Sequence, residues 1–183
     1  MRRAKGLPGL RTERIRVVLE QAIRDTLRSD FRIAHYSIQA DHIHFIVEAD
    51  DPAALTRGMR SLSVRIAMRV NRAVLRRTRG RVWGDRYHRR DLAGPRAVRN
   101  ALVYLFANHL KHGEYDAGLV DPCSSAAWFT GWALTAHALH ALGPPPSEPS
   151  PVQLATTWVL REGWLTKGGG PIRLGEVPRA LRA

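Results

Sequence analysis

Two short runs in which apolar and polar side chains alternate constrain the fold of this chain most strongly. The runs cover residues 31–39 and 42–48, and only Ala40 and Asp41 separate them. Successive side chains of a β-strand point to opposite faces, so these runs predict two antiparallel strands joined by a tight turn. One face of the pair is then apolar and the other polar, which is typical of a sheet that helices cover on one side.

The register of these two predicted strands decides which side chains share a face, and we place Gln39 opposite His42 across the turn. The apolar face then holds the pairs Ala34–Val47, Tyr36–Phe45 and Ile38–Ile43. The polar face holds His35, Ser37, Gln39, His42 and His44. Because His42 and His44 are two residues apart on one strand, their imidazoles project side by side, an arrangement that suits a divalent metal ion. The alternative is an incidental pair, which is the commoner origin of a His-x-His sequence.

Three segments carry apolar residues at helical spacing. They cover residues 11–28, 53–78 and 95–112. We expect Thr12 to cap the first of these helices and Asp51 the second, with Pro52 at its first position. The second helix also carries a stripe of arginines at three- and four-residue spacing: Arg65, Arg69, Arg72, Arg76 and Arg79.

The rest of the chain completes the predicted organisation. Residues 81–92 predict a third strand, bulged near Gly84. The mixture of strands and helices indicates an α+β fold. We divide the chain into a domain over 1–125, a loop and proline-rich linker over 126–151, and a tail over 152–183. The tail is expected to hold a short helix over residues 152–164 and to fray at its end.

Positive charge is concentrated in one part of the sequence. The chain has 29 Lys and Arg residues against 16 Asp and Glu, a net charge of +13. Residues 57–99 alone hold 14 arginines against Asp85 and Asp91, a balance of +12. Such a block predicts contacts with the phosphates of a nucleic acid. The alternative is a solvated basic face that binds no polyanion.

Cysteine content and hydropathy exclude several classes of protein. A single cysteine, Cys123, rules out a disulfide scaffold and a zinc finger built from several cysteines. The sequence has no run of 18 apolar residues to span a membrane, and its basic start lacks the apolar segment of a signal peptide. We therefore expect a cytoplasmic protein with no membrane partner.

The helix predicted over residues 95–112 carries polar side chains within an apolar segment. Tyr104, Asn108 and Lys111 lie at positions i, i+4 and i+7, hence on one face. Buried polar groups need partners, so this stripe requires a reason. One interpretation is structural, with a core tyrosine bonded to a backbone acceptor and an asparagine that holds a further hydrogen bond. The other is a functional site.

Three short motifs follow one another along the chain. They are DHIHFIVE over residues 41–48, WGDRY over 83–87 and YLFANH over 104–109. In this order and spacing, residues 10–125 resemble the single-tyrosine transposases of the HUH endonuclease superfamily, in particular the REP-associated type. The resemblance implies a ferredoxin-like antiparallel sheet with helices on one face. It also implies an enzyme of DNA transposition that cuts single-stranded DNA.

The resemblance gives a role to each candidate residue of the site. His42 and His44 match the two histidines of the HUH motif and Asn108 matches a polar third metal ligand, with Mg²⁺ or Mn²⁺ as the ion. Tyr104 matches the tyrosine that attacks a scissile phosphate and leaves a 5′-phosphotyrosine intermediate with a free 3′-hydroxyl. The expected partner is single-stranded or hairpin DNA, with the protein associated with the nucleoid. A homodimer is compatible with the family.

Basic and aromatic residues around this site are expected to serve the DNA. The residues expected to hold its backbone are Arg65, Arg69, Arg72, Arg76, Arg79, Arg86, Arg89, Arg90 and Lys111. His88, His109 and His112 are expected to contact phosphate or to lie at the surface. Trp83 and Tyr87 have two interpretations of equal weight, stacking on unpaired bases or packing within the fold.

Relatives of this type begin with another strand, central in the sheet and ahead of the first helix. The opening residues MRRAKGLPGLR predict no strand, so we expect a vacant slot with unpaired backbone groups, unless a second subunit fills it. A late start or a truncation would explain the missing strand. Two alternatives to an active transposase stay open. One is a non-catalytic or decayed transposase-derived protein that binds DNA or RNA, and the other is a structural or regulatory protein whose basic face only keeps it soluble.

Overall fold

The computed structural model describes residues 1–26, 28–74, 80–111, 120–135, 138, 140, 142–143 and 147–177. The chain forms two compact units. The first contains Met1–Arg89 with Pro151–Leu154, and the second contains Arg90–Ser150 with Ala155–Ala183. Within the described residues, no helix is both long enough and apolar enough to cross a membrane.

The first unit is built on the predicted strand pair, β1 (Phe31–Ile38) and β2 (Ile43–Ala49), which run antiparallel. Near the turn the predicted register is confirmed: the Gln39 amide donates to the His42 carbonyl at 2.8 Å, and Ile38 pairs with Ile43. Tyr36 also pairs with Phe45, as predicted. The polar face therefore carries the side chains that the sequence placed there, the two histidines included.

Further from the turn the predicted pairing of Ala34 with Val47 is wrong. Ile33 pairs with Val47 and His35 with Ile46, so Ala34 is the extra residue of a β-bulge. Strict alternation would have put Arg32 and Ala34 on the apolar face. The bulge turns Phe31 and Ile33 toward that face instead, and both are completely buried. The free energy gained by burying these two large apolar side chains thus exceeds the cost of interrupting the regular ladder of hydrogen bonds.

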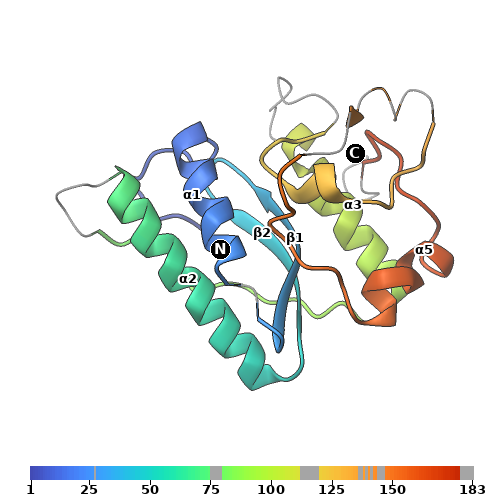
Figure 1. Ribbon diagram of the computed structural model, residues 1–183, viewed down its shortest axis with the longest axis horizontal. Coiled ribbons are helices and arrows are strands. Elements are labelled where there is room, and N and C mark those ends of the chain that lie inside the picture. Colours follow the sequence, from blue (N-terminus) through green and yellow to red (C-terminus); the bar gives the residue numbers. More distant parts are fainter. Residues whose placement is uncertain are drawn as a thin grey trace. The chain divides into compact units, whose positions relative to one another are not determined.

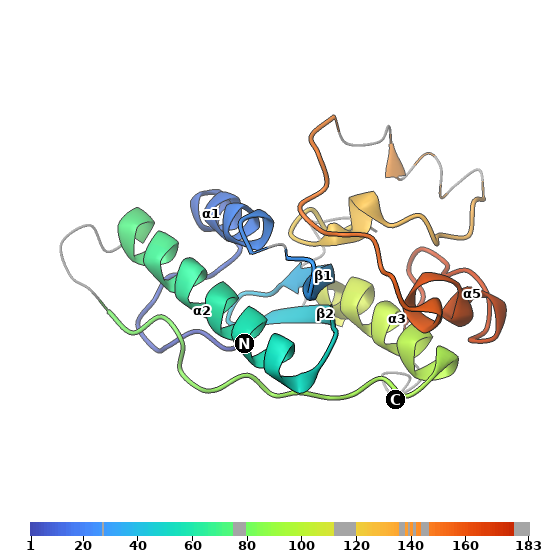
Figure 2. The same cartoon turned by 60° about the horizontal axis from the view of Figure 1, so that its bottom comes forward.

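Two helices cover the apolar face of this sheet, α1 (Glu13–Arg24) and α2 (Pro52–Val74), and they pack against each other (Figure 1, Figure 2). α1 is shorter than predicted, whereas α2 begins one residue earlier than predicted and its predicted end lies outside the described residues. Asp51 caps α2 as expected, because its Oδ1 accepts the Ala54 amide at 2.6 Å. Thr12 occupies the N-cap position of α1, but its side chain makes no capping hydrogen bond. Its carbonyl instead accepts the backbone amides of Ile15 and Arg16. Gly58 lets α2 approach β1, since a Cβ at this position would lie 2.1 Å from Phe31 Cγ.

The N-terminal residues lie between β2 and the segment around Trp83. Arg2 forms an isolated antiparallel bridge with His42, and Arg3 forms one with Trp83. The Ile43 amide donates to the Met1 carbonyl and the Ala4 amide to the Val82 carbonyl, both at 2.8 Å. As expected, no regular strand precedes α1 in the described part of the chain. The expected vacancy is wrong at this end of the sheet, where residues 1–4 of the same chain occupy the central position of a ferredoxin-like order beside His42 and Ile43. Among the described residues, no bond continues this pairing along the rest of β2.

The third strand predicted over residues 81–92 is reduced to the single bridge at Trp83. This segment is short because its pairing partner, the N-terminal segment, is short. The N-terminal segment leaves the sheet near Gly6, whose φ of 86° lies in the left-handed region. A strand without a neighbour gains no ladder hydrogen bonds, so the chain beyond Gly84 runs without regular structure.

The opposite edge of the sheet is also covered by the chain. The Gln153 amide donates to the Ile33 carbonyl at 3.0 Å, so part of Pro151–Leu154 runs beside β1. The helix predicted over residues 152–164 is therefore wrong in its first half. The helical turns come later, as a π-helical stretch (η3, Val159–Gly163) followed by α5 (Trp164–Thr166).

The second unit is organised around α3 (Pro95–Lys111), which begins at Pro95 as predicted. Aromatic side chains from three separate segments pack together beside it. They are Phe106, Phe129, Trp132 and Trp164, with neighbouring ring centroids 4.8 to 5.4 Å apart. Phe129 follows a short 3₁₀ helix, η2 (Ser125–Trp128), and Trp132 forms a parallel bridge with Ile172. The aromatic segment that the sequence presented as a loop is thus part of a core.

Candidate metal and nucleophile site

His42 directly precedes β2 and His44 lies on it, and the Nε2 atoms of the two side chains are close together. His42 Nε2 lies 2.9 Å from His44 Nε2, and the two rings are nearly perpendicular with centroids 4.6 Å apart. Ligands at right angles around one ion, each at about 2.1 Å, would be about 3 Å apart. The separation of the two nitrogens therefore suits two neighbouring ligands of a single divalent ion.

Asp41 holds the His42 ring from the other side. Its Oδ1 lies 2.6 Å from His42 Nδ1, and Arg2 Nε donates to its Oδ2 at 3.1 Å. These contacts, with the His42 hydrogen bond first, hold the pKa of Asp41 below its ordinary value. A carboxylate at Nδ1 favours the tautomer that carries its proton there, which leaves the Nε2 lone pair available. The sequence presented Asp41 only as a turn residue, although it opens the DHIHFIVE motif.

Tyr104 and Asn108 lie one turn apart on α3, in the second unit. Tyr104 is half-buried, whereas Asn108 is completely buried. Neither the Nδ2 nor the Oδ1 of Asn108 has a hydrogen-bond partner in the described part of the chain. A buried amide without a partner is costly, so the structural interpretation of Asn108 as a hydrogen bonder within the fold has no support from these residues.

These residues are compatible with a divalent ion. No cluster of three or more His, Cys, Asp or Glu side chains that could hold a metal exists among the residues described. In the second unit, the buried amide of Asn108 has no hydrogen-bond partner among the described residues, and its oxygen is of the kind that binds such ions. The structure brings His42 and His44 together in the first unit and sets Tyr104 and Asn108 on one face of α3 in the second.

The predicted DNA-contacting arginines divide into three groups. Arg65, Arg72, Arg86, Arg89 and Arg90 are exposed. Arg69 is ion-paired with Asp25 of α1. Arg76 and Arg79, like the side chain of Lys111, lie outside the described part of the structure. A continuous basic stripe along α2 is thus interrupted at Arg69.

Burial and hydrogen bonding also test the predictions for the histidines and for Trp83. His109 is almost completely buried and its Nδ1 lies 2.9 Å from the Phe106 carbonyl, so its expected contact with phosphate or solvent is wrong. His88 is exposed, and His112 lies outside the described residues. Trp83 Nε1 donates to the Ser63 carbonyl at 3.0 Å, which favours packing on α2 over base stacking.

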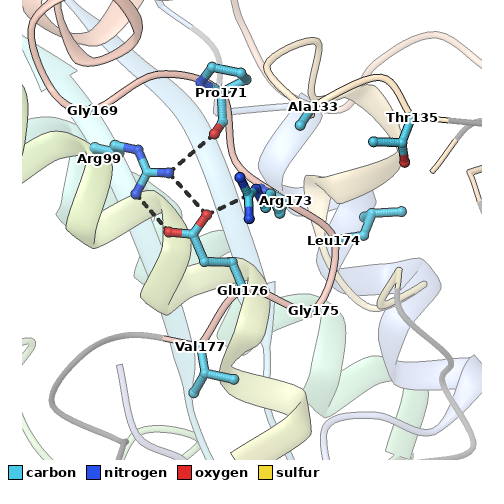
Figure 3. A pocket seen from close by; sticks show the side chains of 10 residues that line it. All are labelled: Arg99, Ala133, Thr135, Gly169, Pro171, Arg173, Leu174, Gly175, Glu176 and Val177. Carbon is cyan, nitrogen blue, oxygen red and sulfur yellow. Dashed lines mark hydrogen bonds and ion pairs between the residues drawn. The ribbon is translucent and has the colours of Figure 1, made fainter. Parts of the chain in front are cut away.

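Sequence reasoning missed an arginine that organises the second unit. A hollow of about 900 Å³ is lined in part by Arg99 of α3, Arg173 and Glu176 (Figure 3). Both Nη atoms of Arg99 donate to the Glu176 carboxylate, at 2.7 and 3.0 Å, and its Nε donates to the Gly170 carbonyl at 2.9 Å. Burial alone would raise the pKa of Glu176, but Arg99 lowers it below its ordinary value. The end of the tail, expected to fray, is thus fastened to α3 as far as Val177.

Comparison with known families adds a finding independent of this geometry. The family model described as "Transposase IS200 like" matches residues 2–99, more than half of the chain. The matched region contains both histidines and ends before Tyr104. No match is found among curated proteins or among solved structures.

Proposed function

Since the chain belongs to the family of IS200-like transposases, which process DNA, we propose that it is a metal-dependent endonuclease and strand transferase. Its substrate would be single-stranded DNA, including DNA that folds into a hairpin. The observation that carries the proposal is the convergence of His42 Nε2 and His44 Nε2 at 2.9 Å, with Asp41 behind His42. Two imidazoles with a carboxylate behind one of them are a usual arrangement for binding a divalent ion.

Under this proposal His42, His44 and Asn108 would hold Mg²⁺ or Mn²⁺. When bound, such an ion polarises a phosphate and offsets the charge that develops on its oxygens. Asp41 keeps the His42 ring in place and its Nε2 free of a proton. The alternation of β2, with Ile43 buried beneath the pair, fixes both histidines on a rigid strand.

Tyr104 would act as the nucleophile. Its hydroxyl gives up its proton to solvent as the oxygen forms a bond to phosphorus, the bond from phosphorus to the 3′ oxygen breaks, and the departing 3′ oxygen takes up a proton from solvent. The products are a 5′-phosphotyrosine and a 3′-hydroxyl. Because the phosphodiester is exchanged for a phosphotyrosine ester, a second strand can be joined without ATP. A tyrosine on a regular helix is held with little freedom, which reduces the entropic part of the barrier.

The exposed arginines would bind the DNA backbone. A short block that holds 14 arginines and only two acidic residues attracts phosphates at long range and releases counterions on binding. Such contacts position the strand and carry no sequence information by themselves. Recognition of a particular hairpin would therefore need groups other than these arginines.

A non-catalytic protein that is derived from such a transposase and still binds DNA or RNA is the second candidate. One observation favours it: the match to the family ends at residue 99, before the proposed nucleophile and third ligand. Both candidates share the basic surface, so nucleic-acid binding alone does not separate them.

The separating experiment is a search for a covalent adduct. The full chain is incubated with a hairpin-bearing single-stranded oligonucleotide and Mn²⁺, and the products are run on a denaturing gel. We expect an adduct with the wild type and none with Tyr104→Phe or His44→Ala. Tyr87→Phe is the matched control, because Tyr87 is also half-buried, and it should react as the wild type does. No adduct from the wild type, or an equal adduct from Tyr104→Phe, would favour the non-catalytic candidate.

A further inference from the structure

Gln39 shares the polar face of the sheet with the two histidines. Its backbone amide bonds the His42 carbonyl at 2.8 Å, and Ser37, two residues earlier, is paired with His44. Side chains directly opposite in an antiparallel pair have Cβ atoms about 4.5–5.5 Å apart. Ser37 and Gln39 are therefore the nearest cross-strand neighbours of the histidine pair on that face.

The Gln39 side chain bends back along the strand toward this pair. Its Nε2 donates to Ser37 Oγ at 2.7 Å, which places the amide over the residue opposite His44. Both Ser37 and Gln39 are only 1% exposed. Two polar side chains that are buried and bonded to each other have few rotamers available, so the amide is held in one orientation.

One atom of this amide is left without a partner. Gln39 Oε1 is buried and accepts no hydrogen bond from any residue that the structure describes. Exchanging the amide oxygen and nitrogen would leave the nitrogen unpartnered instead, and only the placement seen here leaves an acceptor available. A buried polar atom that the described residues do not satisfy calls for a further partner, such as a bound water molecule.

We propose that Gln39 is a positioning residue for the divalent ion, and that its Oε1 accepts a hydrogen bond from a water molecule bound to that ion. This inference rests on the proposed function, since it needs an ion at His42 and His44. Mg²⁺ and Mn²⁺ keep several of their waters when few protein ligands are present, and groups that bind those waters raise the affinity of the site. Ser37 acts through Gln39 by fixing its amide.

The test measures Mn²⁺ binding to the full chain, by titration calorimetry and by the electron paramagnetic resonance signal of free Mn²⁺, without DNA. We expect Gln39→Leu, which replaces the amide by an apolar side chain of comparable volume and so removes the acceptor, to weaken Mn²⁺ binding about tenfold. Gln39→Glu should tighten it, because a carboxylate is a stronger acceptor for water on a cation. Ser37→Ala should weaken it by a smaller factor. Gln21→Leu, at an exposed position of α1, is the matched control and should bind as the wild type does.

The outcomes separate this inference from the proposed function. If the wild type binds no Mn²⁺, or if His44→Ala binds it equally well, the metal site and this inference both fail. If His44→Ala loses the ion while Gln39→Leu keeps wild-type affinity, only the role of Gln39 is overturned. Should Gln39→Leu fail to fold, Gln39→Glu decides, and weaker binding or unchanged binding by that variant contradicts the proposal.

Discussion

Asp41 Oδ1 lies 2.6 Å from His42 Nδ1, on the side of the ring opposite to the Nε2 atom that meets His44. The contact makes Asp41 a candidate for tuning the affinity of the histidine pair without touching an ion. We expect Asp41→Asn to weaken Mn²⁺ binding by about tenfold or more, because the ring loses its charged acceptor. Calorimetric titration of the full chain measures this effect.

Asp50→Asn is the control for this prediction, since Asp50 is an exposed carboxylate that pairs with Arg32 on the same sheet at 3.3 Å. It should leave Mn²⁺ affinity unchanged. Equal affinity of Asp41→Asn and the wild type would contradict a role for Asp41 in holding His42.

The register near the turn could be predicted because it depends on a few local residues. Gln39 and His42 flank a two-residue turn, so their pairing fixes every pair up to Tyr36 and Phe45. The bulge at Ala34 could not be predicted in this way. It exists because Phe31 must reach the surface of α2 at Gly58, a contact 27 residues along the chain that no local pattern records.

The N-terminal contribution to the sheet was missed for a related reason. Residues 1–4 are too few to show alternation, and they join the sheet through bonds to partners about 40 and 80 residues away, at Asp41 and Val82. The histidine pair and the face shared by Tyr104 and Asn108 could be predicted, because strand and helix periods alone place them. Asp41 was missed as a support for His42 because a turn residue has no periodic signal.

The close packing of Gly58 on Phe31 predicts an unusual result for an alanine in a helix. Alanine favours helices, but its Cβ would lie 2.1 Å from Phe31 Cγ in a rigid core. We expect Gly58→Ala to lower the free energy of unfolding by about 2 kcal/mol, measured by urea denaturation. The smaller side chain of Phe31→Leu should recover part of that loss in the double variant. Additive effects of the two substitutions would contradict the proposed clash.

The ion pair between Arg99 and Glu176 predicts a specific loss in the second unit. Both side chains are largely buried, with 14% and 21% exposure, and the pair is bidentate at 2.7 and 3.0 Å. We expect Arg99→Ala to destabilise the protein by about 2 kcal/mol and to open the segment around Gly170 to limited proteolysis. Arg161→Ala breaks an exposed pair with Glu162 and should cost well under 1 kcal/mol. Equal protease resistance of Arg99→Ala and the wild type would show that Arg99 does not fasten the tail.

The arginines of α2 should differ in their contribution to DNA binding. Arg65 and Arg72 are exposed, whereas the charge of Arg69 is already matched by Asp25. We expect Arg65→Ala and Arg72→Ala each to weaken binding of a hairpin oligonucleotide and to lower the salt slope by about 1, as seen by fluorescence anisotropy at several salt concentrations. Arg69→Ala should change the slope less. The same slope for all four proteins, the wild type included, would place the DNA elsewhere on the protein.

The His35 side chain should make the free energy of unfolding depend on pH. Desolvation of its ring lowers its pKa to about 4, whereas an unfolded chain would protonate it near 6.5. Between these values the unfolded state binds a proton that the folded state does not, so stability falls as the pH drops. We expect the free energy of unfolding to be about 2 kcal/mol lower at pH 5 than at pH 7, measured by urea denaturation.

The substitution His35→Asn tests whether this one ring is responsible. It removes the titrating group, so the difference between pH 7 and pH 5 should shrink even if the variant is less stable at both. His88→Asn, at an exposed position, should keep the full difference. The pKa of Asp30 is lowered to about 2 and that of Asp41 is also lowered, so their effect on stability falls mainly below pH 5. A variant without His35 that loses as much stability at pH 5 as the wild type would assign the pH dependence to another group.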